Sequence, residues 1–273
     1  MKVAALHNET LGRDSMDDAA LARFPWRWMA LLGLAAYGLF LLVWLPASLL
    51  WGQVAEEWPE ASLDTAGATV WAGDARPARV AGHELSVSWA FDPSALLAAR
   101  LGSRTTLTGD GLAWTGRIAW RSDDDWALTE ARADLVVARL PIWLGQPLPP
   151  MFTPLGGEAT LTFDRLDIRE GWPTGIEAGQ LAFRDLALGS LALGDWRGEV
   201  ILDRDGAFAV ALVPLGERLA GTLDARLTRQ GWSIRLALKP GAAAPENLSG
   251  VLPLLGARNA QGFYEANFEG QWP

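Results

Sequence analysis

An uncharged run near the N-terminus constrains this chain more than any other feature. No Asp, Glu, Lys or Arg occurs between residues 28 and 55, and residues 28–45 read WMALLGLAAYGLFLLVWL. At about 1.5 Å of rise per residue, this stretch and one further helical turn would cross the roughly 30 Å hydrocarbon core of a bilayer. The sequence therefore predicts a single transmembrane helix over residues 28–50.

The residues that flank the run predict its orientation. Arg23 and Arg27 precede it, whereas Glu56, Glu57 and Glu60 follow it. By the positive-inside rule, residues 1–27 form a cytoplasmic tail and residues 51–273 form a domain outside the cytoplasm. In a Gram-negative cell, this domain lies in the periplasm and the helix crosses the inner membrane. Tryptophans stand near both ends of the run, where their rings prefer the level of the lipid headgroups: Trp26, Trp28, Trp44 and Trp51.

A cleavable signal peptide is the competing interpretation of the same run. The apolar stretch is longer than a usual signal-peptide core, about 27 residues precede it, and no small-x-small cleavage site follows it. We therefore expect a retained anchor. Pro46 is expected to end or kink the helix near its outer face, because proline lacks the N–H and clashes with the preceding turn.

The composition argues against most kinds of enzyme and against nucleic-acid binding. The 273 residues include no cysteine and only two histidines, His7 and His83, so neither a histidine-based triad nor a metal cluster can be assembled outside the membrane. The run Asp123–Asp125 lacks the spacing of an EF-hand loop. The net charge of −9 repels phosphate backbones. We expect no catalytic residue, no metal and no cofactor.

Beyond residue 60 the chain reads as a series of short strands. Apolar and polar residues alternate, which is typical of strands with one buried face, for example in residues 85–89, 223–227 and 234–238. Turn signals such as Asp205-Gly206 and Gln230-Gly231 separate these strands. The pattern predicts an antiparallel meander.

An internal echo supports a repeating β architecture. The segment from Leu161 to Ile168 recurs 20 residues later, with Leu181 and Phe183 in place of Leu161 and Phe163. In both copies the apolar phase shifts between the aromatic residue and the next Leu, which predicts a bulge or a bend at the charged pair between them.

Three segments interrupt the strands. Asp92, Pro93 and Gly102 resemble the N-cap, first residue and C-terminal glycine of a short helix. A second helical turn is expected over residues 246–255, before a last strand over residues 262–272. The proline-rich segment 140–157 is expected to cross over between two halves of one sheet, with a domain boundary there as the alternative.

Taken in order, several short motifs are similar to those of the type II secretion system protein N family. The first part of the set is Leu45-Pro46-Ala47, Gly67-x-x-x-Trp71-x-Gly73-x-Ala75 and Trp89-x-x-x-Pro93-x-x-Leu96-Leu97. The second part is Leu140-Pro141 with Gly156-Gly157, Gly179-x-Leu181, Gly221-x-Leu223, and Leu254-Leu255-Gly256 with Gly262-Phe263-Tyr264.

The resemblance implies a mainly β protein, with one N-terminal transmembrane helix and a curved antiparallel periplasmic sheet with a few short helices. It also implies an accessory role in assembling or stabilising the machine that exports folded proteins across the outer membrane. The implied partners are other inner-membrane subunits, with outer-membrane subunits as further candidates. The family is distantly similar to AsmA-type proteins, whose curved sheets form open apolar grooves. No catalytic residues carry over.

An open sheet of this kind would leave an apolar face that binds a partner. The candidate groove residues are one alternating set: Leu181, Phe183, Leu223, Leu227, Leu236 and Leu238. The alternative architecture is a sandwich in which a second sheet seals that face. The alternative function is a lipid-binding or lipid-transfer protein whose apolar face receives the acyl chains of membrane lipid.

Overall fold

The computed structural model describes residues 26–49, 62–63, 68–80, 83–122, 124–140, 154–189 and 191–271. The chain divides into two compact units, Met1–Trp44 and Leu45–Pro273. Each unit is described by itself.

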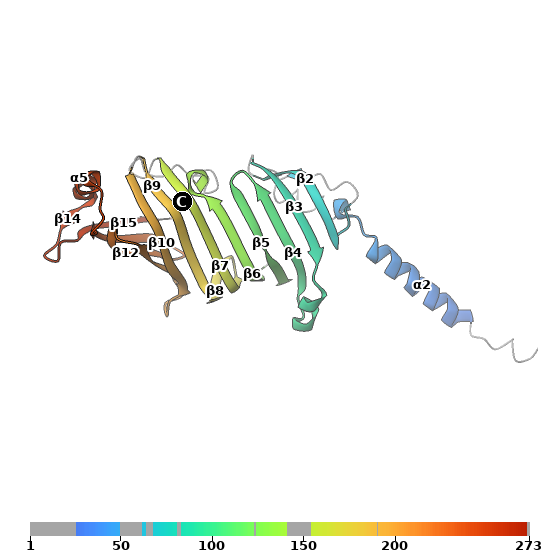
Figure 1. Cartoon of the computed structure of the whole chain (residues 1–273). Helices are drawn as coiled ribbons and strands as arrows, with labels where there is room; N and C mark the ends of the chain where they lie inside the picture. Colours follow the sequence, from blue (N-terminus) through green and yellow to red (C-terminus); the bar gives the residue numbers. More distant parts are fainter. Residues whose placement is uncertain are drawn as a thin grey trace, which may run out of the picture. The chain divides into compact units, whose positions relative to one another are not determined.

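The described part of the first unit is the helix α2, Trp26–Val43 (Figure 1). Its large apolar side chains are exposed, with Leu32 at 73% and Leu34 at 67%. The helix ends before Pro46, as expected from the missing N–H of proline. Among the described residues, no helix combines the length and the apolar character that crossing a bilayer requires. The span over residues 28–50 stays a prediction.

The described residues of the second unit form one antiparallel sheet of 15 strands. The first seven strands are β1 (Ser62–Leu63), β2 (Ala72–Val80), β3 (His83–Phe91), β4 (Leu101–Gly109), β5 (Leu112–Ser122), β6 (Asp125–Val136) and β7 (Leu155–Arg169). The remaining strands are β8 (Trp172–Glu177), β9 (Gly179–Leu188), β10 (Leu191–Leu202), β11 (Phe208–Leu215), β12 (Leu219–Leu227), β13 (Gly231–Pro240), β14 (Ala257–Arg258) and β15 (Tyr264–Gln271).

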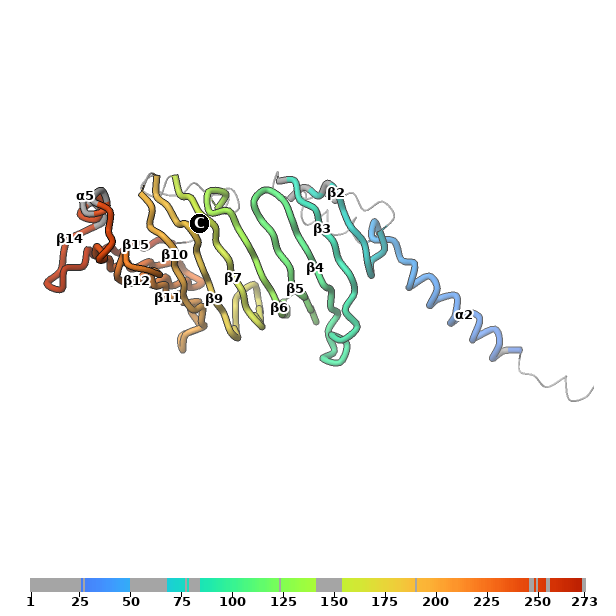
Figure 2. Tube along the Cα trace, in the orientation of Figure 1, coloured from blue at the N-terminus to red at the C-terminus, as the bar shows by residue number. Residues whose placement is uncertain are grey.

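The strand order follows the chain almost throughout, so the expected meander is confirmed. The path runs from β1 to β7 and then through β9 to β13, β15 and β14, while β8 pairs only with the end of β7. The trace in Figure 2 passes up and down through neighbouring strands, and the strands from β11 onward turn out of the plane of the earlier ones. This is an open, curved sheet. All the described strands belong to this sheet. The second sheet that the alternative sandwich architecture requires does not occur among them.

The backbone is irregular at the charged pair in both copies of the internal echo, as predicted. On β9, Asp185 has φ +48° and the register with β10 shifts next to it, which is a bulge. On β7, Asp164 and the facing Glu130 of β6 are both missing from the ladder and Glu130 has φ +49°, while the register between β6 and β7 does not shift.

The turn between β10 and β11 is the one predicted at Asp205-Gly206. The carboxylate of Asp203 accepts hydrogen bonds from the backbone N–H groups of Asp205 and Ala207, both at 2.9 Å. Gly206 has φ +76°, a conformation that glycine adopts without steric cost.

The first predicted short helix is a 3-10 helix, η1, Pro93–Ala98, with Asp92 as its N-cap. Its end was predicted wrongly at Gly102, because Ala99 supplies the left-handed residue with φ +53°. Gly102 instead lies in β4, where a Cβ would collide with the side chain of Ala95. A second 3-10 turn, η2 (Val137–Arg139), follows β6.

The main hydrophobic core lies at the C-terminal end of the sheet. The helix α5, Glu246–Leu255, was predicted, and it contributes the fully buried Leu248 and Leu252. These two side chains join one cluster with Trp196, Val200 and Leu238. In this region, among the described residues, a helix rather than a second sheet covers the apolar face.

The proline-rich segment that was expected to cross over lies largely outside the described residues, which omit 141–153. The strands before and after it, β6 and β7, pair directly with each other. Asp125 pairs with Arg169 at one end of this ladder, and Val136 pairs with Glu158 at the other.

Candidate functional site

One row of apolar residues crosses the sheet from β2 to β15. Each member lies directly opposite the next one on the neighbouring strand, so the row follows the direction of the hydrogen bonds. The members of this apolar row are Ala75, Val87, Leu107, Trp114, Ala133, Leu161, Leu181, Gly198, Leu212, Leu223, Leu236 and Ala266.

Gly198 interrupts the side chains of the apolar row for a steric reason. A Cβ at this position would collide with the carbonyl oxygen of Ala211 on β11. The close approach of β10 and β11 therefore requires glycine here.

Burial changes along the apolar row. At the β2–β7 end, Val87, Leu107, Trp114 and Leu161 are half-buried. At the C-terminal end, Leu212 and Leu236 are buried in the cluster that α5 completes. The row is thus buried at its C-terminal end and partly accessible from β3 to β7, while Ala75 on β2 is buried.

The structure places all six predicted groove residues on this face. Leu181, Leu223 and Leu236 belong to the apolar row, Phe183 and Leu238 lie two positions along their strands, and Leu227 lies opposite Trp232. Leu236 and Leu238 are only 8% and 3% exposed. The other four are half-buried. Accessible apolar surface in this set is therefore confined to the members that α5 leaves uncovered.

The opposite face carries a matching polar row, one residue away on each strand. Its members are Asp74, Ser88, Thr106, Thr115, Arg132, Thr162, Gln180, Glu199, Ala211, Asp224, Arg235 and Asn267. All are polar except Ala211. A hollow of about 370 Å³ lies on this face, lined among others by Glu199, Asp224 and Arg235.

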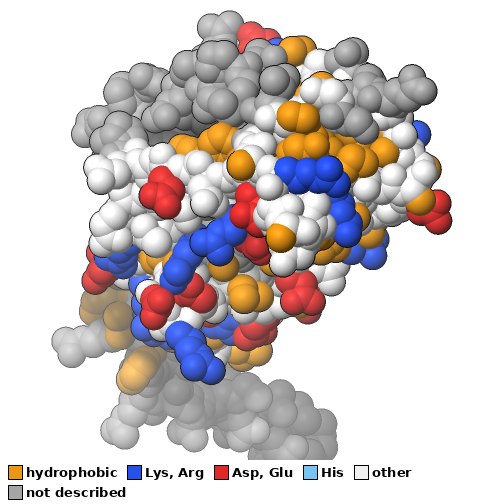
Figure 3. All heavy atoms as spheres, turned by 90° about the vertical axis from the view of Figure 1, so that its left-hand side faces the viewer, with side chains coloured by type: hydrophobic (Ala, Val, Ile, Leu, Met, Phe, Trp, Pro, Cys, Tyr) orange, Lys and Arg blue, Asp and Glu red, His pale blue; other side chains and the backbone are white. Residues whose placement is uncertain are grey.

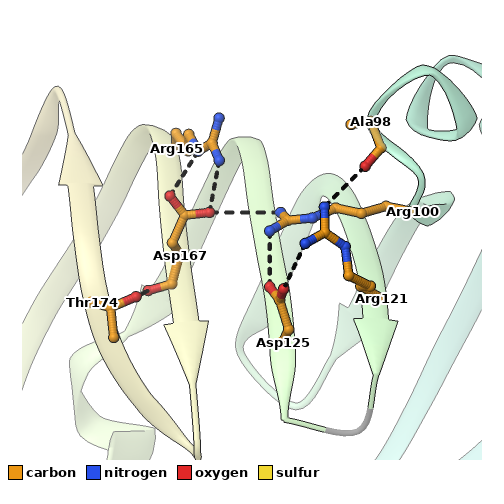
Figure 4. A network of polar contacts seen from close by, with 7 residues as sticks. All are labelled: Ala98, Arg100, Arg121, Asp125, Arg165, Asp167 and Thr174. Atoms are coloured by element: carbon orange, nitrogen blue, oxygen red, sulfur yellow. Dashed lines mark hydrogen bonds and ion pairs between the residues drawn. The ribbon is translucent and has the colours of Figure 1, made fainter.

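An ion-pair network on the same face ties three strands, β5, β6 and β7, to the connection before β4 (Figure 4). The Arg100 guanidinium lies 2.8 Å from the Asp125 carboxylate and 3.6 Å from that of Asp167. Arg165 holds Asp167 through two nitrogens at 2.8 and 2.9 Å. Arg121 bridges Asp125, at 3.7 Å, and the Ala98 carbonyl of η1, at 3.3 Å. Each carboxylate thus meets two guanidinium groups, and the arrangement positions η1 on the sheet.

Asp92 caps η1 beside this network. Its carboxylate accepts hydrogen bonds from the Ser94 hydroxyl at 2.6 Å and from the Ser94 backbone N–H at 3.1 Å. The hydroxyl bond holds the pKa of Asp92 below its usual 3.8, burial acts in the opposite direction, and the Arg117 guanidinium lowers the pKa further. Arg117 lies 3.6 Å from the carboxylate. Asp92 is therefore a charged cap.

The residues that could bear metal or acid–base chemistry are dispersed. No cluster of three or more His, Cys, Asp or Glu side chains suited to a metal ion occurs in the part of the chain that the structure describes. His83 begins β3, Asp125 is committed to Arg100, and His7 and Asp123 lie outside the described residues.

Sequence reasoning missed the Arg100 network and the β2–β6 members of the apolar row. The alternation in each strand was visible, and the hairpin turns could have aligned Val87, Leu107 and Trp114. No local signal brings Arg100, Asp125 and Asp167 together, because these residues lie far apart in the sequence.

Comparisons with known proteins agree with this architecture. The family described as type II secretion system (T2SS), protein N matches residues 59–267. The type II secretion system protein N of Aeromonas hydrophila is 28% identical over 258 residues, covering 89% of this chain and 97% of that protein. The protein of the same name from Klebsiella pneumoniae is 28% identical over 257 residues, covering 89% and 95%. No solved structure matches this chain.

The match covers most of the periplasmic region expected from the sequence, including nearly the whole sheet, and it confirms the resemblance seen in the ordered motifs. The chain belongs to the type II secretion system protein N family.

Proposed function

We propose that this chain is an accessory inner-membrane component of a type II secretion system. It assists the assembly or the stability of the machine that exports folded proteins across the outer membrane, and its role is not catalytic. The observation that carries this proposal is the family match over residues 59–267. The two relatives that carry the family name over nearly their whole length support it.

The proposal includes an N-terminal anchor. Residues 1–27 lie in the cytoplasm, the apolar run crosses the inner membrane once, and the sheet lies in the periplasm. Two observations support this topology: the uncharged run between residues 28 and 55, and the exposure of large apolar side chains on α2, such as Leu32 and Leu34. Side chains of this kind are stable in lipid and costly in water.

The proposed partners are other inner-membrane subunits of the system, with outer-membrane subunits as further candidates. Membrane lipid surrounds the anchor, and no nucleic acid is bound. The two faces of the sheet support a binding role of this kind. The polar row presents charged groups, while the β2–β7 end of the apolar row offers half-buried apolar side chains. Contiguous apolar surface that stays partly uncovered is typical of interaction sites.

The test is gentle detergent extraction of the tagged full-length chain from its own membranes, followed by mass spectrometry of proteins and lipids. Secretion-system subunits in near-stoichiometric amounts would support the proposal. A chain that carries phospholipid on its sheet but brings none of those subunits would refute it and favour the lipid-transfer alternative.

The topology is tested separately, because the chain has no cysteine and single cysteines can be placed at will. Glu217→Cys in the exposed β11–β12 turn should react with a membrane-impermeant maleimide in spheroplasts. The matched Ser15→Cys variant should react only after the inner membrane is opened. Labelling of Ser15→Cys in intact spheroplasts would contradict the proposed orientation.

A further inference from the structure

The C-terminal end of the sheet is formed by β15, and only its beginning is covered. On the side away from β13, β14 pairs with β15 at two positions, Glu265 and Tyr264. No described strand pairs with the stretch from Ala266 to Gln271 on that side. β15 therefore continues as an edge strand beyond β14.

One hydrogen bond identifies the backbone groups that point to this edge. The N–H of Asn259, which follows β14, donates to the carbonyl of Phe263 at 2.8 Å, so Phe263 faces the β14 side. Backbone direction alternates along a strand, and the pairing with β13 shows no register shift from Tyr264 to Gln271. Asn267, Glu269 and Gln271 therefore direct their N–H and C=O groups to the open edge. We call these three residues the β15 edge.

The side chains of the β15 edge are all exposed on the polar face of the sheet. Glu269 lines two adjoining hollows, of about 370 and 450 Å³. Its cross-strand neighbour is Ser233, and among the described residues no ion pair engages its carboxylate. Two arginines lie nearby on this face: Arg235 of β13, opposite Asn267, and Arg226 of β12, which is paired with Asp203 and Asp205. Glu269 thus presents at the edge a negative charge that no ion pair among the described residues engages.

Glycine shapes the opposite face of this edge. Gly270 packs under the Trp232 indole, since a Cβ there would lie 2.5 Å from the ring. An added strand would therefore place one side chain beside Glu269 on the polar face and its neighbours beside the Trp232 ring and Phe268 on the apolar face. Figure 3, which views this end of the molecule, shows acidic and basic side chains interspersed with apolar ones.

We infer that the β15 edge binds an extended segment of another subunit of the secretion machine, which adds a strand to the sheet. This inference rests on the proposed function. The segment carries Lys or Arg opposite Glu269 and apolar residues at the flanking positions. Backbone hydrogen bonds give the affinity and the alternate side chains give the specificity, as in other cases of strand addition.

The charge of the edge disfavours a second copy of this chain as the occupant. Two copies can pair all three edge residues of one chain with all three of the other only if a twofold axis passes through Glu269. That axis places the two Glu269 carboxylates directly opposite each other, and like charges in this position are destabilising. A basic residue of a different chain turns the same position into an ion pair.

The test is hydrogen exchange of the segment 264–271, measured by mass spectrometry on the full-length chain. The chain alone in detergent is compared with the assembly that co-purifies from membranes. The amides of Asn267, Glu269 and Gln271 should exchange about tenfold more slowly, or slower still, in the assembly, because strand addition takes them out of water. Unchanged exchange in an assembly that contains the other subunits overturns the inference and leaves the proposed function intact. An extract that contains none of those subunits refutes the proposed function itself.

Two variants sharpen the test. Glu269→Pro removes an N–H that faces the edge and leaves the bonds to β13 intact, since Phe268 and Gly270 face that strand. It should abolish the protection. Glu269→Arg should weaken the association by up to about fivefold, whereas the matched Glu217→Arg in the β11–β12 turn should not. Thermal melting of each variant checks that the sheet still folds.

Two other results would also overturn the inference. If the amides of the β15 edge are protected from exchange in the purified chain, and the protection grows with the concentration of the chain, then a second copy binds the edge. Protection produced by phosphatidylethanolamine–phosphatidylglycerol vesicles alone would assign it to lipid.

Discussion

Leu161 of β7 lies directly opposite Leu181 of β9, so the two copies of the internal echo are partners in one ladder. The echo is therefore a structural repeat: each copy supplies one member of the apolar row, and an irregularity of the strand follows at the charged pair. A repeat of this kind lets one sheet grow strand by strand without a second layer. The side chains that stabilise each strand come mainly from its two neighbours.

The C-terminal cluster should be the most sensitive part of the sheet to truncation. Leu252 of α5 is 1% exposed and packs in the cluster with Trp196 and Leu238. We expect Leu252→Ala to lower the free energy of unfolding by about 2–5 kcal/mol, because it removes buried methyl groups and leaves a cavity. Urea unfolding monitored by tryptophan fluorescence measures the loss. Leu97→Ala, at a side chain that is 93% exposed, is the control and should change stability by no more than about 0.5 kcal/mol. Equal effects of the two variants would contradict the assigned core.

Two tryptophans on the same face differ in how their indole N–H is satisfied. Trp89 donates from Nε1 to the Thr69 carbonyl at 3.1 Å, whereas Nε1 of Trp114 is buried without a hydrogen-bond partner among the described residues. Replacement by Phe removes a similar ring area at both sites. It breaks a hydrogen bond only at Trp89. We expect Trp89→Phe to destabilise the protein by about 1–3 kcal/mol more than Trp114→Phe. Equal losses in urea unfolding would mean that the Trp114 N–H has a partner.

The Arg100 network should stabilise the sheet more than the ion pairs on its surface do. The Arg100 side chain is 11% exposed and lies 2.8 Å from Asp125. Arg100→Met leaves two largely buried carboxylates with fewer donors, so we expect a loss of about 1–3 kcal/mol. Arg132→Met breaks a bidentate pair with Asp134 whose Arg132 side chain is 54% exposed, and it should destabilise the protein less than Arg100→Met does. The expected order is measured by urea unfolding at low and high salt. The reverse order would show that Arg100 adds nothing to stability.

The local features of this fold were predictable because their causes are local. Alternation in residues 223–227 predicts a strand with one buried face, and Asp203 with Gly206 forms a turn from residues close together in the chain. Asp92 and Pro93 likewise begin a helix through their own backbone preferences. The end of that helix was predicted wrongly, because the packing of Gly102 against Ala95 is a contact between η1 and β4.

The features that could not be predicted depend on contacts between distant strands. Burial of Leu236 and Leu238 requires α5 to fold back over β13. The alternation of β13 does not indicate which of its apolar side chains α5 covers. The Arg100–Asp125–Asp167 network is similar, since each residue alone looks like an ordinary charged residue at the end of a strand. The family match supplied what residue chemistry could not, because none of these side chains identifies a partner.

The stability of the folded protein in acid should depend on the charge of Asp92. Since the folded-state pKa of Asp92 lies below its ordinary value of 3.8, the charged carboxylate stabilises the folded protein above that value. This contribution is fully present at neutral pH and is lost as the pH falls below 3.8 and through the lowered folded-state pKa. Asp92→Asn keeps a capping oxygen but never carries the charge, so it should be less stable than the parent chain at pH 7 and should approach it near pH 3. Ser94→Ala removes the hydroxyl that lowers the pKa most and should reduce the same difference. Urea midpoints at the two pH values measure the difference in stability between the parent chain and Asp92→Asn. A difference that is the same at pH 7 and pH 3 would show that Asp92 acts through its shape rather than through its charge.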